Sequence, residues 1–349
     1  MRTTIPIAFV TAAAFALGAS PSLRAEPAPV PLELASTFGG SMPILGVAAR
    51  DLAEKVARAS NGRIVVRFHE PGELVPAAET VRAVSDGRVT AAWAGAGWFA
   101  DDDSAFNFFS TVPFGPDMGE YMAWMYEGGG LALAREMFAR RDVFNIPCGM
   151  IPPEASGWFR REIRSVDDLK GLRMRFFGLG ALVMRKLGVA TEQIAPGDIL
   201  ARLEDGSLDA AEFSLPAMDE PLGFQKVAKY YYFPGWHQQA TFFDLDINLK
   251  VWEGLDTQAQ SIIELACSDV MRDMIARGEA RQAGAIRRLQ AEGVEVRRWA
   301  PRILVAMEDA WRAVVTEESA RNPDFKRVYE SYASFRADYR IWHALSYLN

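Results

Sequence analysis

After its first 30 residues, the chain alternates short apolar runs with longer amphipathic segments. The short runs alternate as strands do, whereas the longer segments repeat their apolar residues at helical spacing and end at glycine. The order strand, helix, strand, helix, strand is typical of a mostly parallel sheet with helices on its faces. The predicted strands are residues 32–38, 63–68 and 88–93, and the predicted helices are residues 44–60 and 76–86.

The pattern of residues 81–93 returns without gaps at residues 200–212. Each copy has a helix end, an Asp-Gly pair and a strand. This self-similarity predicts two lobes of like construction, although Asp-Gly is also an ordinary turn. Because ligands of open parallel sheets bind beyond the carboxyl ends of strands, we expect Trp93, Arg175 and Glu212 to lie near a ligand.

Two long helices are predicted near the C-terminus. Residues 256–293 contain no proline and repeat apolar residues at helical spacing, which predicts a helix roughly 50 Å long, enough to lie along both lobes. From Pro323 onward, an apolar stripe indicates a helix that packs on the core rather than on a partner. The stripe consists of Phe325, Val328, Tyr332, Phe335, Tyr339 and Trp342.

One charged residue interrupts the apolar stretch of residues 171–180. Arg175 is costly to bury unless an anion meets it, and its planar fork suits a carboxylate. Gly178 and Gly180 then allow a tight turn into a helix, whose N-terminus also favours negative charge. We therefore interpret Arg175 as the anchor of an anionic ligand. Its alternative partner is a structural Asp or Glu.

Composition and charge narrow the function classes. Half of the 349 residues are hydrophobic and 24% are charged, as in globular proteins. A net charge of −7, without Lys/Arg clusters among aromatic residues, argues against nucleic acid binding. Residues 1–25 have one early charge, an apolar run too short to span a bilayer and small residues before Ala25, which predicts a secretory signal peptide. No later segment reads as membrane-spanning, so we expect a chain exported from the cytoplasm.

The remaining residues, roughly 320 of them, suffice for two lobes with separate cores. Cys148 and Cys267 are the two cysteines. An exported protein permits a disulfide, but thiols so far apart in sequence can equally be small buried hydrophobes, and we expect the latter.

The usual catalytic motifs are absent from the sequence. It contains no Gly-x-Ser-x-Gly turn, no His-Glu-x-x-His and no phosphate-binding Gly-x-x-x-x-Gly-Lys. Val183 stands where a dinucleotide fingerprint beginning at Gly178 needs its third glycine, and there are only three histidines. These absences argue against a hydrolase or a dehydrogenase. They do not argue against an enzyme that uses carboxylates for catalysis.

Several stretches resemble the solute-binding subunits of TRAP transporters (tripartite ATP-independent periplasmic transporters, DctP type). They are residues 158–175 with the Gly-Leu-Gly that follows, the strand at 208–213 and the Tyr-rich segment 230–236. The resemblance covers nearly the whole mature chain. The Gly-Leu-Gly and the Pro-Gly-Trp at 234–236 are most similar to the branch that binds 2-oxo and 2-hydroxy acids together with a metal ion.

The resemblance implies an α/β fold: a two-lobed periplasmic binding protein with a parallel-rich sheet in each lobe and a long helix spanning both. Lobe I is expected to comprise residues 26–150 and about 243–285, and lobe II residues 151–242 and about 286–349. Such a protein is a receptor rather than an enzyme. It closes on a small organic acid in the periplasm and delivers it to TRAP membrane permease subunits.

The resemblance also assigns roles to single residues. Arg175 matches the arginine that binds the substrate carboxylate, Glu212 matches a metal-ligating carboxylate, and Phe213 matches the residue that ligates through its backbone carbonyl. Gln238 stands where several members carry a further acidic ligand, and Glu154 stands where they carry a substrate-contacting glutamine. The acid and the amide are thus exchanged, with the same total charge.

The charge count favours Ca²⁺ over Na⁺ as the bound ion. Glu154 and Glu212 contribute −2, a monocarboxylate −1 and Arg175 +1, which leaves −2 for a cation to balance. Alternatively, Glu154 is protonated or bonds a substrate hydroxyl, and no ion is needed. The aromatic residues near the candidate cleft would favour branched or aromatic 2-oxo acids over pyruvate. Those expected to contact substrate are Trp98, Phe99, Phe177 and Trp236.

Two other function classes remain as alternatives. One is an exported carboxylate-based enzyme, such as a lyase that uses Glu154 and Glu212. The other is an assembly or sensor module with a vestigial ligand site. Some members of the family dimerise through an extended C-terminal helix, an arrangement that we do not expect here because the sequence stops at Asn349.

Overall fold

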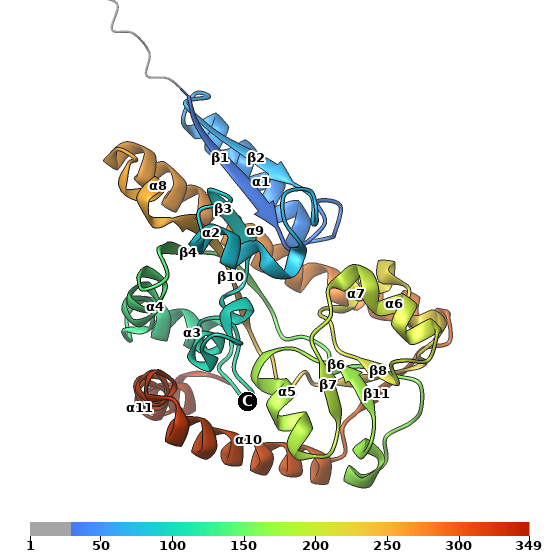
Figure 1. The fold of residues 1–349 in the computed structure, drawn as a ribbon. Coiled ribbons are helices and arrows are strands. Elements are labelled where there is room, and N and C mark those ends of the chain that lie inside the picture. Colours follow the sequence, from blue (N-terminus) through green and yellow to red (C-terminus); the bar gives the residue numbers. More distant parts are fainter. Residues whose placement is uncertain (1–28, 349) are drawn as a thin grey trace, which may run out of the picture.

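Two β-sheets form the centres of two lobes (Figure 1). The computed structural model describes residues 29–348, so the predicted signal peptide, residues 1–25, lies outside the described residues. The sheet of lobe I has the order β2-β1-β3-β10-β4, and its strands are β1 (Val30–Ser36), β2 (Ile64–His69), β3 (Ala91–Ala94), β4 (Val143–Ile151) and β10 (Thr241–Asn248). The sheet of lobe II has the order β11-β9-β5-β8-β6-β7, and its strands are β5 (Gly157–Phe159), β6 (Arg173–Arg175), β7 (Ala190–Glu192), β8 (Ala210–Ala211), β9 (Tyr230–Phe233) and β11 (Glu295–Arg298).

Helices cover both sheets. The α-helices are α1 (Leu45–Ala59), α2 (Thr80–Ser85), α3 (Met118–Tyr126), α4 (Gly130–Ala139), α5 (Gly178–Lys186), α6 (Pro196–Glu204), α7 (Pro216–Asp219), α8 (Leu249–Glu253), α9 (Thr257–Ala291), α10 (Pro301–Arg321) and α11 (Pro323–Ser346). Short 3₁₀ helices are η1 (Ala77–Glu79), η2 (Ala96–Phe99), η3 (Ser104–Phe109), η4 (Val166–Leu169), η5 (Glu220–Leu222) and η6 (Phe224–Lys226). The α/β class predicted from the sequence is confirmed.

The internal repeat corresponds to one structural unit in each lobe. In lobe I, α2 is followed by Asp86-Gly87 and leads into β3, which pairs parallel with β1. In lobe II, α6 is followed by Asp205-Gly206 and leads into β8, which pairs parallel with β6. Both glycines adopt left-handed φ angles, 72° and 77°, which a residue without a side chain reaches at no steric cost. The Asp-Gly pairs therefore terminate helices in equivalent places.

The chain passes between the lobes four times. Residues 152–156 connect β4 to β5, residues 234–240 connect β9 to β10, α9 runs behind both lobes, and α10 leads back to α11 (Figure 1). As predicted, α9 is a single helix of 35 residues that packs on α1 and β4 in lobe I and on α7 and β11 in lobe II. Despite this length, neither α9 nor any other helix between residues 29 and 348 is apolar enough to cross a bilayer.

The two cysteines form a disulfide, which corrects the expectation of separate buried thiols. Cys148 lies on β4 and Cys267 lies on α9, and both side chains are fully buried. Although 119 residues separate them in sequence, the packing of α9 on β4 brings their Cα atoms to 4.2 Å. The large sequence separation of Cys148 and Cys267 therefore did not indicate that they are far apart in the fold.

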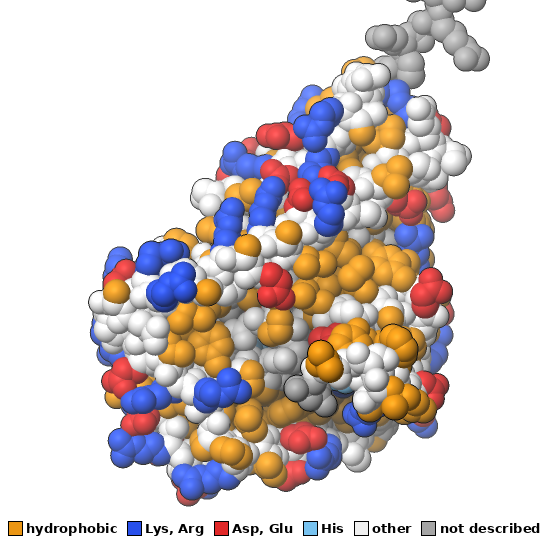
Figure 2. All heavy atoms as spheres, turned by 180° about the vertical axis from the view of Figure 1, so that it is seen from behind, with side chains coloured by type: hydrophobic (Ala, Val, Ile, Leu, Met, Phe, Trp, Pro, Cys, Tyr) orange, Lys and Arg blue, Asp and Glu red, His pale blue; other side chains and the backbone are white. Residues whose placement is uncertain are grey.

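The C-terminal helices pack on both lobes. Helix α10 lies against α5 in lobe II, whereas α11 returns to α3, α4 and η3 in lobe I, so the expected assignment of residues 286–349 to lobe II does not hold for α11. Core packing of its apolar stripe is confirmed for Phe325, Val328 and Tyr332. It is wrong for Trp342, which is 59% exposed because the helix extends beyond the elements on which it packs. Exposed hydrophobic side chains also gather on the back of the molecule (Figure 2).

Lobe I buries two carboxyl groups within its sheet. Asp244 and Asp246 lie on β10, and the Asn145 amide donates a hydrogen bond to Asp246 Oδ1 at 3.0 Å. Among the described residues, no partner reaches the Oδ2 atom of either aspartate. Burial raises the pKa of Asp246 to about 7, and burial together with the neighbouring Asp246 raises the pKa of Asp244 well above its usual value.

These carboxyl groups predict that stability falls as pH rises. An unfolded aspartate releases its proton near pH 3.9, whereas folded Asp246 retains it up to about pH 7. For Asp246 alone, unfolding therefore becomes easier between about pH 4 and pH 7, by on the order of 2–4 kcal/mol. Asp246→Asn should reduce this slope in urea unfolding measured at several pH values.

The exposed Asp86 offers a matched control, because Asp86→Asn should leave the slope unchanged. A slope of the same size in Asp246→Asn would show that this carboxyl group does not titrate as described.

Candidate functional site

The segments that cross between the lobes form the floor of a polar site. The Gly235 N–H donates to the Glu154 carbonyl at 2.9 Å, and the Glu154 N–H donates to the Gln238 carbonyl at 3.1 Å, so the two crossing segments are joined. They approach so closely that a Cβ atom on Gly235 would lie 2.3 Å from the Glu154 carbonyl oxygen. A glycine is needed at this position because any side chain would force the segments apart.

Arg175 ends β6 and is 4% exposed. Its Nη1 donates to the backbone carbonyl and to Oε2 of Glu212, both at 2.6 Å, and its Nε donates to the Ile194 carbonyl at 3.3 Å. Nη2 has no hydrogen-bond partner in the part of the chain that the structure describes. The structural carboxylate partner considered from the sequence is therefore present, and one side of the fork remains available to a ligand.

Two buried carboxyl groups lie beside the arginine. Glu154 Oε1 accepts from the Ser214 hydroxyl at 3.0 Å. With its nitrogen turned toward the acids, the Gln238 amide donates to Glu154 Oε2 at 2.5 Å and to Glu212 Oε1 at 3.1 Å, and its oxygen accepts from the Thr241 hydroxyl. Burial, and then the nearby Glu212 charge, raise the pKa of Glu154 well above its usual value. Glu154 therefore favours a proton or a cation.

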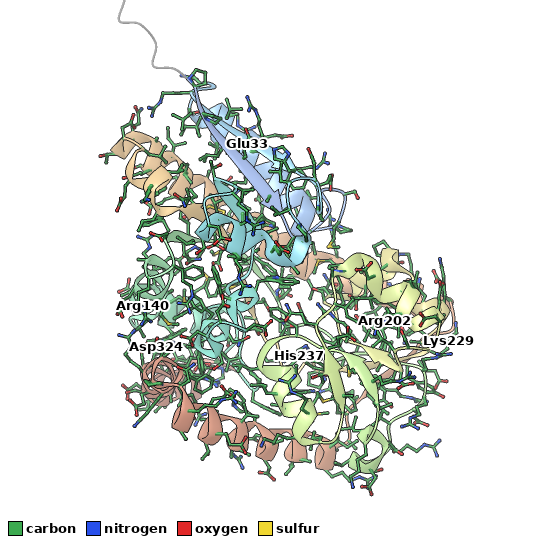
Figure 3. The ribbon with its side chains drawn as sticks, in the orientation of Figure 1. Glu33, Arg140, Arg202, Lys229, His237 and Asp324 are labelled. Carbon is green, nitrogen blue, oxygen red and sulfur yellow. A yellow bond between two sulfur atoms is a disulfide. The ribbon has the colours of Figure 1, made fainter. Side chains whose placement is uncertain are left out.

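His237 completes this cluster, although it was not predicted from the sequence to belong to the site. Its Nε2 lies 3.4 Å from Glu212 Oε1, and its Nδ1 is buried without a partner among residues 29–348. The ring lies between the lobes (Figure 3). The one available signal was its place next to Gln238, since a histidine beside a candidate ligand is itself a candidate.

The loop after β8 is supported by a buried aspartate. Asp219 Oδ1 accepts from the Ser214 N–H at 3.1 Å, and Asp219 Oδ2 accepts from Trp158 Nε1 and the Tyr231 hydroxyl, both at 2.8 Å. Burial raises the pKa of Asp219 to about 7. Because Ser214 also donates to Glu154, Asp219 positions the acids of the site indirectly.

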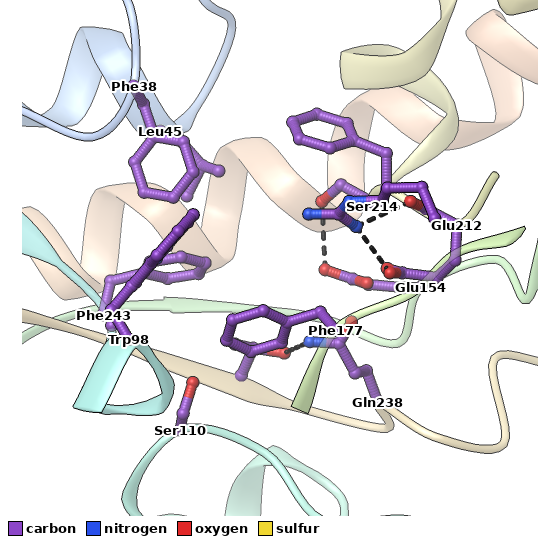
Figure 4. Close-up of a pocket in the computed structure, with 14 residues that line it drawn as sticks. Phe38, Leu45, Trp98, Ser110, Glu154, Phe177, Glu212, Ser214, Gln238 and Phe243 are labelled. Atoms are coloured by element: carbon purple, nitrogen blue, oxygen red, sulfur yellow. Dashed lines mark hydrogen bonds and ion pairs between the residues drawn. The ribbon is translucent and has the colours of Figure 1, made fainter. Parts of the chain in front are cut away.

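The polar cluster opens into a cavity of ≈ 40 Å³, room for about three water molecules or a compact ligand. Hydrophobic side chains close the side opposite Glu154, Glu212 and Ser214 (Figure 4). The cavity is lined by Phe38, Leu45, Gly95, Trp98, Ser110, Glu154, Arg175, Phe177, Glu212, Phe213, Ser214, Gln238, Thr241 and Phe243. One end of the site is thus charged and the other is apolar.

Most of the residues predicted from the sequence meet at this cavity. The structure brings together Arg175, Glu154, Trp98, Phe177, Glu212, Phe213 and Gln238. It places two predicted substrate contacts in the core instead: Phe99 packs on Phe106 and Phe138, and Trp236 packs on Phe114.

Several lining residues were not predicted from the sequence. Phe38 follows β1, so the rule that ligands bind beyond the carboxyl ends of strands could have found it. Ser110 and Phe243 carried no such signal, because one follows η3 and the other lies inside β10.

The residues present fit a metal ion. One ligand atom from each of Glu154, Glu212 and His237 lies within 4.8 Å of the others. The Phe213 carbonyl accepts no hydrogen bond from any described residue, so it is free to bind a cation. Carboxylate, carbonyl and amide oxygens are the donors that Ca²⁺ prefers, although His237 would add a nitrogen that is unusual for it.

Residues 35–322 match the family model "Bacterial extracellular solute-binding protein, family 7" (DctP). A protein of Nostoc sp. described as a monocarboxylate 2-oxoacid-binding periplasmic protein is 34% identical over 303 residues. The alignment covers 87% of this chain and 83% of that protein.

Solved structures of TRAP transporter solute-binding proteins are also similar. One from Bordetella bronchiseptica, with calcium and picolinate bound, is 35% identical and superposes with a TM-score of 0.90, covering 92% of this chain and 95% of its own. Another from Pseudoalteromonas atlantica, with sodium and pyruvate bound, is 29% identical with a TM-score of 0.88, covering 91% and 97%.

The geometry predicts unequal losses of stability for the two acids. Because burial disfavours a charge on Glu154 and glutamine has nearly the same shape, Glu154→Gln should unfold within about 2 °C of the parent protein in chelator. Glu212→Gln leaves the buried Arg175 guanidinium without its counter-charge, which costs on the order of 3–5 kcal/mol. Thermal unfolding of both variants in chelator tests this expectation, and equal losses would contradict it.

Proposed function

The chain belongs to family 7 of the bacterial extracellular solute-binding proteins, the DctP receptors of TRAP transporters, and on that premise we propose that it binds a 2-oxo or 2-hydroxy monocarboxylate and delivers it to a membrane permease. The observation that carries the proposal is the half-occupied Arg175 fork in a cavity beside two buried acids. The ligand carboxylate would bind the free Nη2 side of the fork.

We propose a bound cation, most simply Ca²⁺, between the ligand and the acids. Glu154, Glu212 and the Phe213 carbonyl would hold it, with His237 as a further nearby donor, and Gln238 would join them by turning its amide oxygen, instead of its nitrogen, toward the ion. It would neutralise the net charge of −2 that remains when Glu154, Glu212 and a bound monocarboxylate are balanced only by Arg175. The calcium of the Bordetella relative and the sodium of the Pseudoalteromonas relative support a cation bound together with the acid.

The hydrophobic side of the cavity supports an acid with an apolar tail. Trp98 and Phe177 line it together with Phe38, Phe213 and Phe243. The Nostoc relative is described as binding 2-oxo acids, and the Bordetella relative holds picolinate, a flat aromatic acid. A branched or aromatic 2-oxo acid would use both ends of the site.

We propose that residues 1–25 direct export and that the receptor works in the periplasm. The buried disulfide supports an oxidising compartment. The lobes would be residues 26–150 with about 243–285, and residues 151–242 with the chain from about 286 to the end of α10, while α11 joins the first lobe.

We propose that the protein does not turn its ligand over. The competing class, a lyase that uses Glu154 and Glu212, would consume the acid during prolonged incubation. A receptor would return it unchanged and in stoichiometric amount, which chromatography of the released ligand distinguishes.

The anchoring role predicts the effect of Arg175→Lys. A lysine cannot offer the planar fork, so the affinity for pyruvate should fall about 100-fold in calorimetric titration with Ca²⁺ present. Arg173→Lys is the matched control, because Arg173 lies on the same strand but pairs with Asp209 at the surface. Unchanged affinity in Arg175→Lys would mean that Arg175 does not anchor the carboxylate, and no binding by either protein would favour the vestigial site.

The cation predicts a dependence on chelation. Removing metal ions from the purified protein should weaken binding of pyruvate at least tenfold, since no cation then links the incoming carboxylate to Glu154 and Glu212. Added Ca²⁺ should restore the affinity, and Na⁺ should restore less of it. If titration gives the same affinity with and without ions, the metal proposal is wrong and the protonated form of Glu154 replaces it.

A further inference from the structure

The two lobes touch beside the ligand cavity at a glycine. Phe177 follows β6 in lobe II, and its ring lies against Gly97 of η2 in lobe I. A Cβ atom on Gly97 would lie 2.4 Å from Cζ and 2.9 Å from Cε1 of that ring. Such distances do not occur between real atoms, so the ring occupies this place only because position 97 carries no side chain.

Gly178, the residue after Phe177, makes a second close contact, in which a side chain of lobe I packs against a glycine of lobe II. Gly178 begins α5 with a φ of 58°, and a Cβ atom there would lie 2.7 Å from Oδ1 of Asn107. Asn107 belongs to η3 in lobe I, is 2% exposed, and is held by a hydrogen bond from its Nδ2 to the Ser104 carbonyl at 2.9 Å. Phe177 therefore enters lobe I at Gly97, while Asn107 enters lobe II at Gly178.

This contact continues directly into the wall of the cavity. Trp98 is the neighbour of Gly97, and its ring centroid lies 5.9 Å from that of Phe177. Both rings line the cavity, one from each lobe. The degree of lobe closure at Gly97 therefore sets the distance between the apolar wall and the charged end of the cavity.

We propose that Gly97 and Gly178 determine the depth of closure and, through it, the size of acid that the receptor prefers. The inference rests on the proposed function, because it concerns the same site. A side chain at position 97 would hold Phe177 away and leave the cavity longer. A short acid would then lose contact with one lobe, whereas a longer acid would fill the added space.

Gly97→Ala tests this inference with two acids of different length. Pyruvate and 4-methyl-2-oxopentanoate are titrated calorimetrically into the parent protein and the variant, with Ca²⁺ present. We expect the ratio of the two affinities to shift at least tenfold toward the longer acid, chiefly through weaker binding of pyruvate.

Gly197→Ala is the matched control. Gly197 lies in α6, its φ is ordinary and no atom lies within 4 Å of the added Cβ, so both affinities should stay as in the parent protein. Thermal unfolding without ligand shows whether each variant folds.

A double-mutant cycle with Phe177→Ala keeps the test decisive if Gly97→Ala folds poorly. Once the ring is removed, an added methyl group at position 97 meets nothing from Phe177, so Gly97→Ala should have no further effect on the affinity ratio in that background. The expected result is strong coupling between positions 97 and 177.

Three results would overturn the inference. Equal losses for both acids would mean that closure does not select size, and unchanged affinities would mean that the contact does not limit closure. Independent effects of the two substitutions would mean that Phe177 is not the group that Gly97 accommodates. Binding of neither acid by the parent protein, seen before any variant is made, would instead overturn the proposed function together with this inference.

Discussion

The buried ion pair of Arg175 and Glu212 is the interaction on which the site depends. A lone guanidinium with 4% exposure would be too costly to bury, and the carboxylate and carbonyl of one residue meet one side of it. Arg175 ends β6 and Glu212 follows the neighbouring β8, so the parallel pairing of these two strands places the charges together. The sheet of lobe II thus builds the charged end of the cavity from adjacent strand ends.

The crossing segments add the residues that make this pair useful. Glu154 and Gln238 come from two different connections between the lobes, and backbone hydrogen bonds join those connections at the site. Any relative movement of the lobes must bend these same segments. The positions of Glu154 and Gln238 are therefore coupled to opening and closing of the lobes. A ligand that binds next to Arg175 and shifts these side chains would also shift the lobes.

The local sequence pattern predicted helices, strands and the position of Arg175. Tertiary packing decided which other residues form the site. The repeated helix-Gly-strand unit, the long helix and Arg175 could be found because periodicity, glycine position and an isolated charge are visible in a short window. Which aromatic residues face the cavity could not: Phe99 and Phe243 look alike in sequence, yet one joins a cluster with Phe106 and the other lines the site. The role of His237 likewise depends on how the connection between β9 and β10 brings its ring to Glu212.

The pairing of Cys148 with Cys267 was beyond sequence reasoning for a related reason, since it requires α9 to pack on β4. Its position has a consequence for the covalent integrity of the protein. The residues of lobe II between β5 and β9 all lie inside the loop that this bond closes. A protease that nicks an exposed turn between β5 and β9 would therefore release no fragment: the two pieces would stay tethered through lobe I until a reductant separated them.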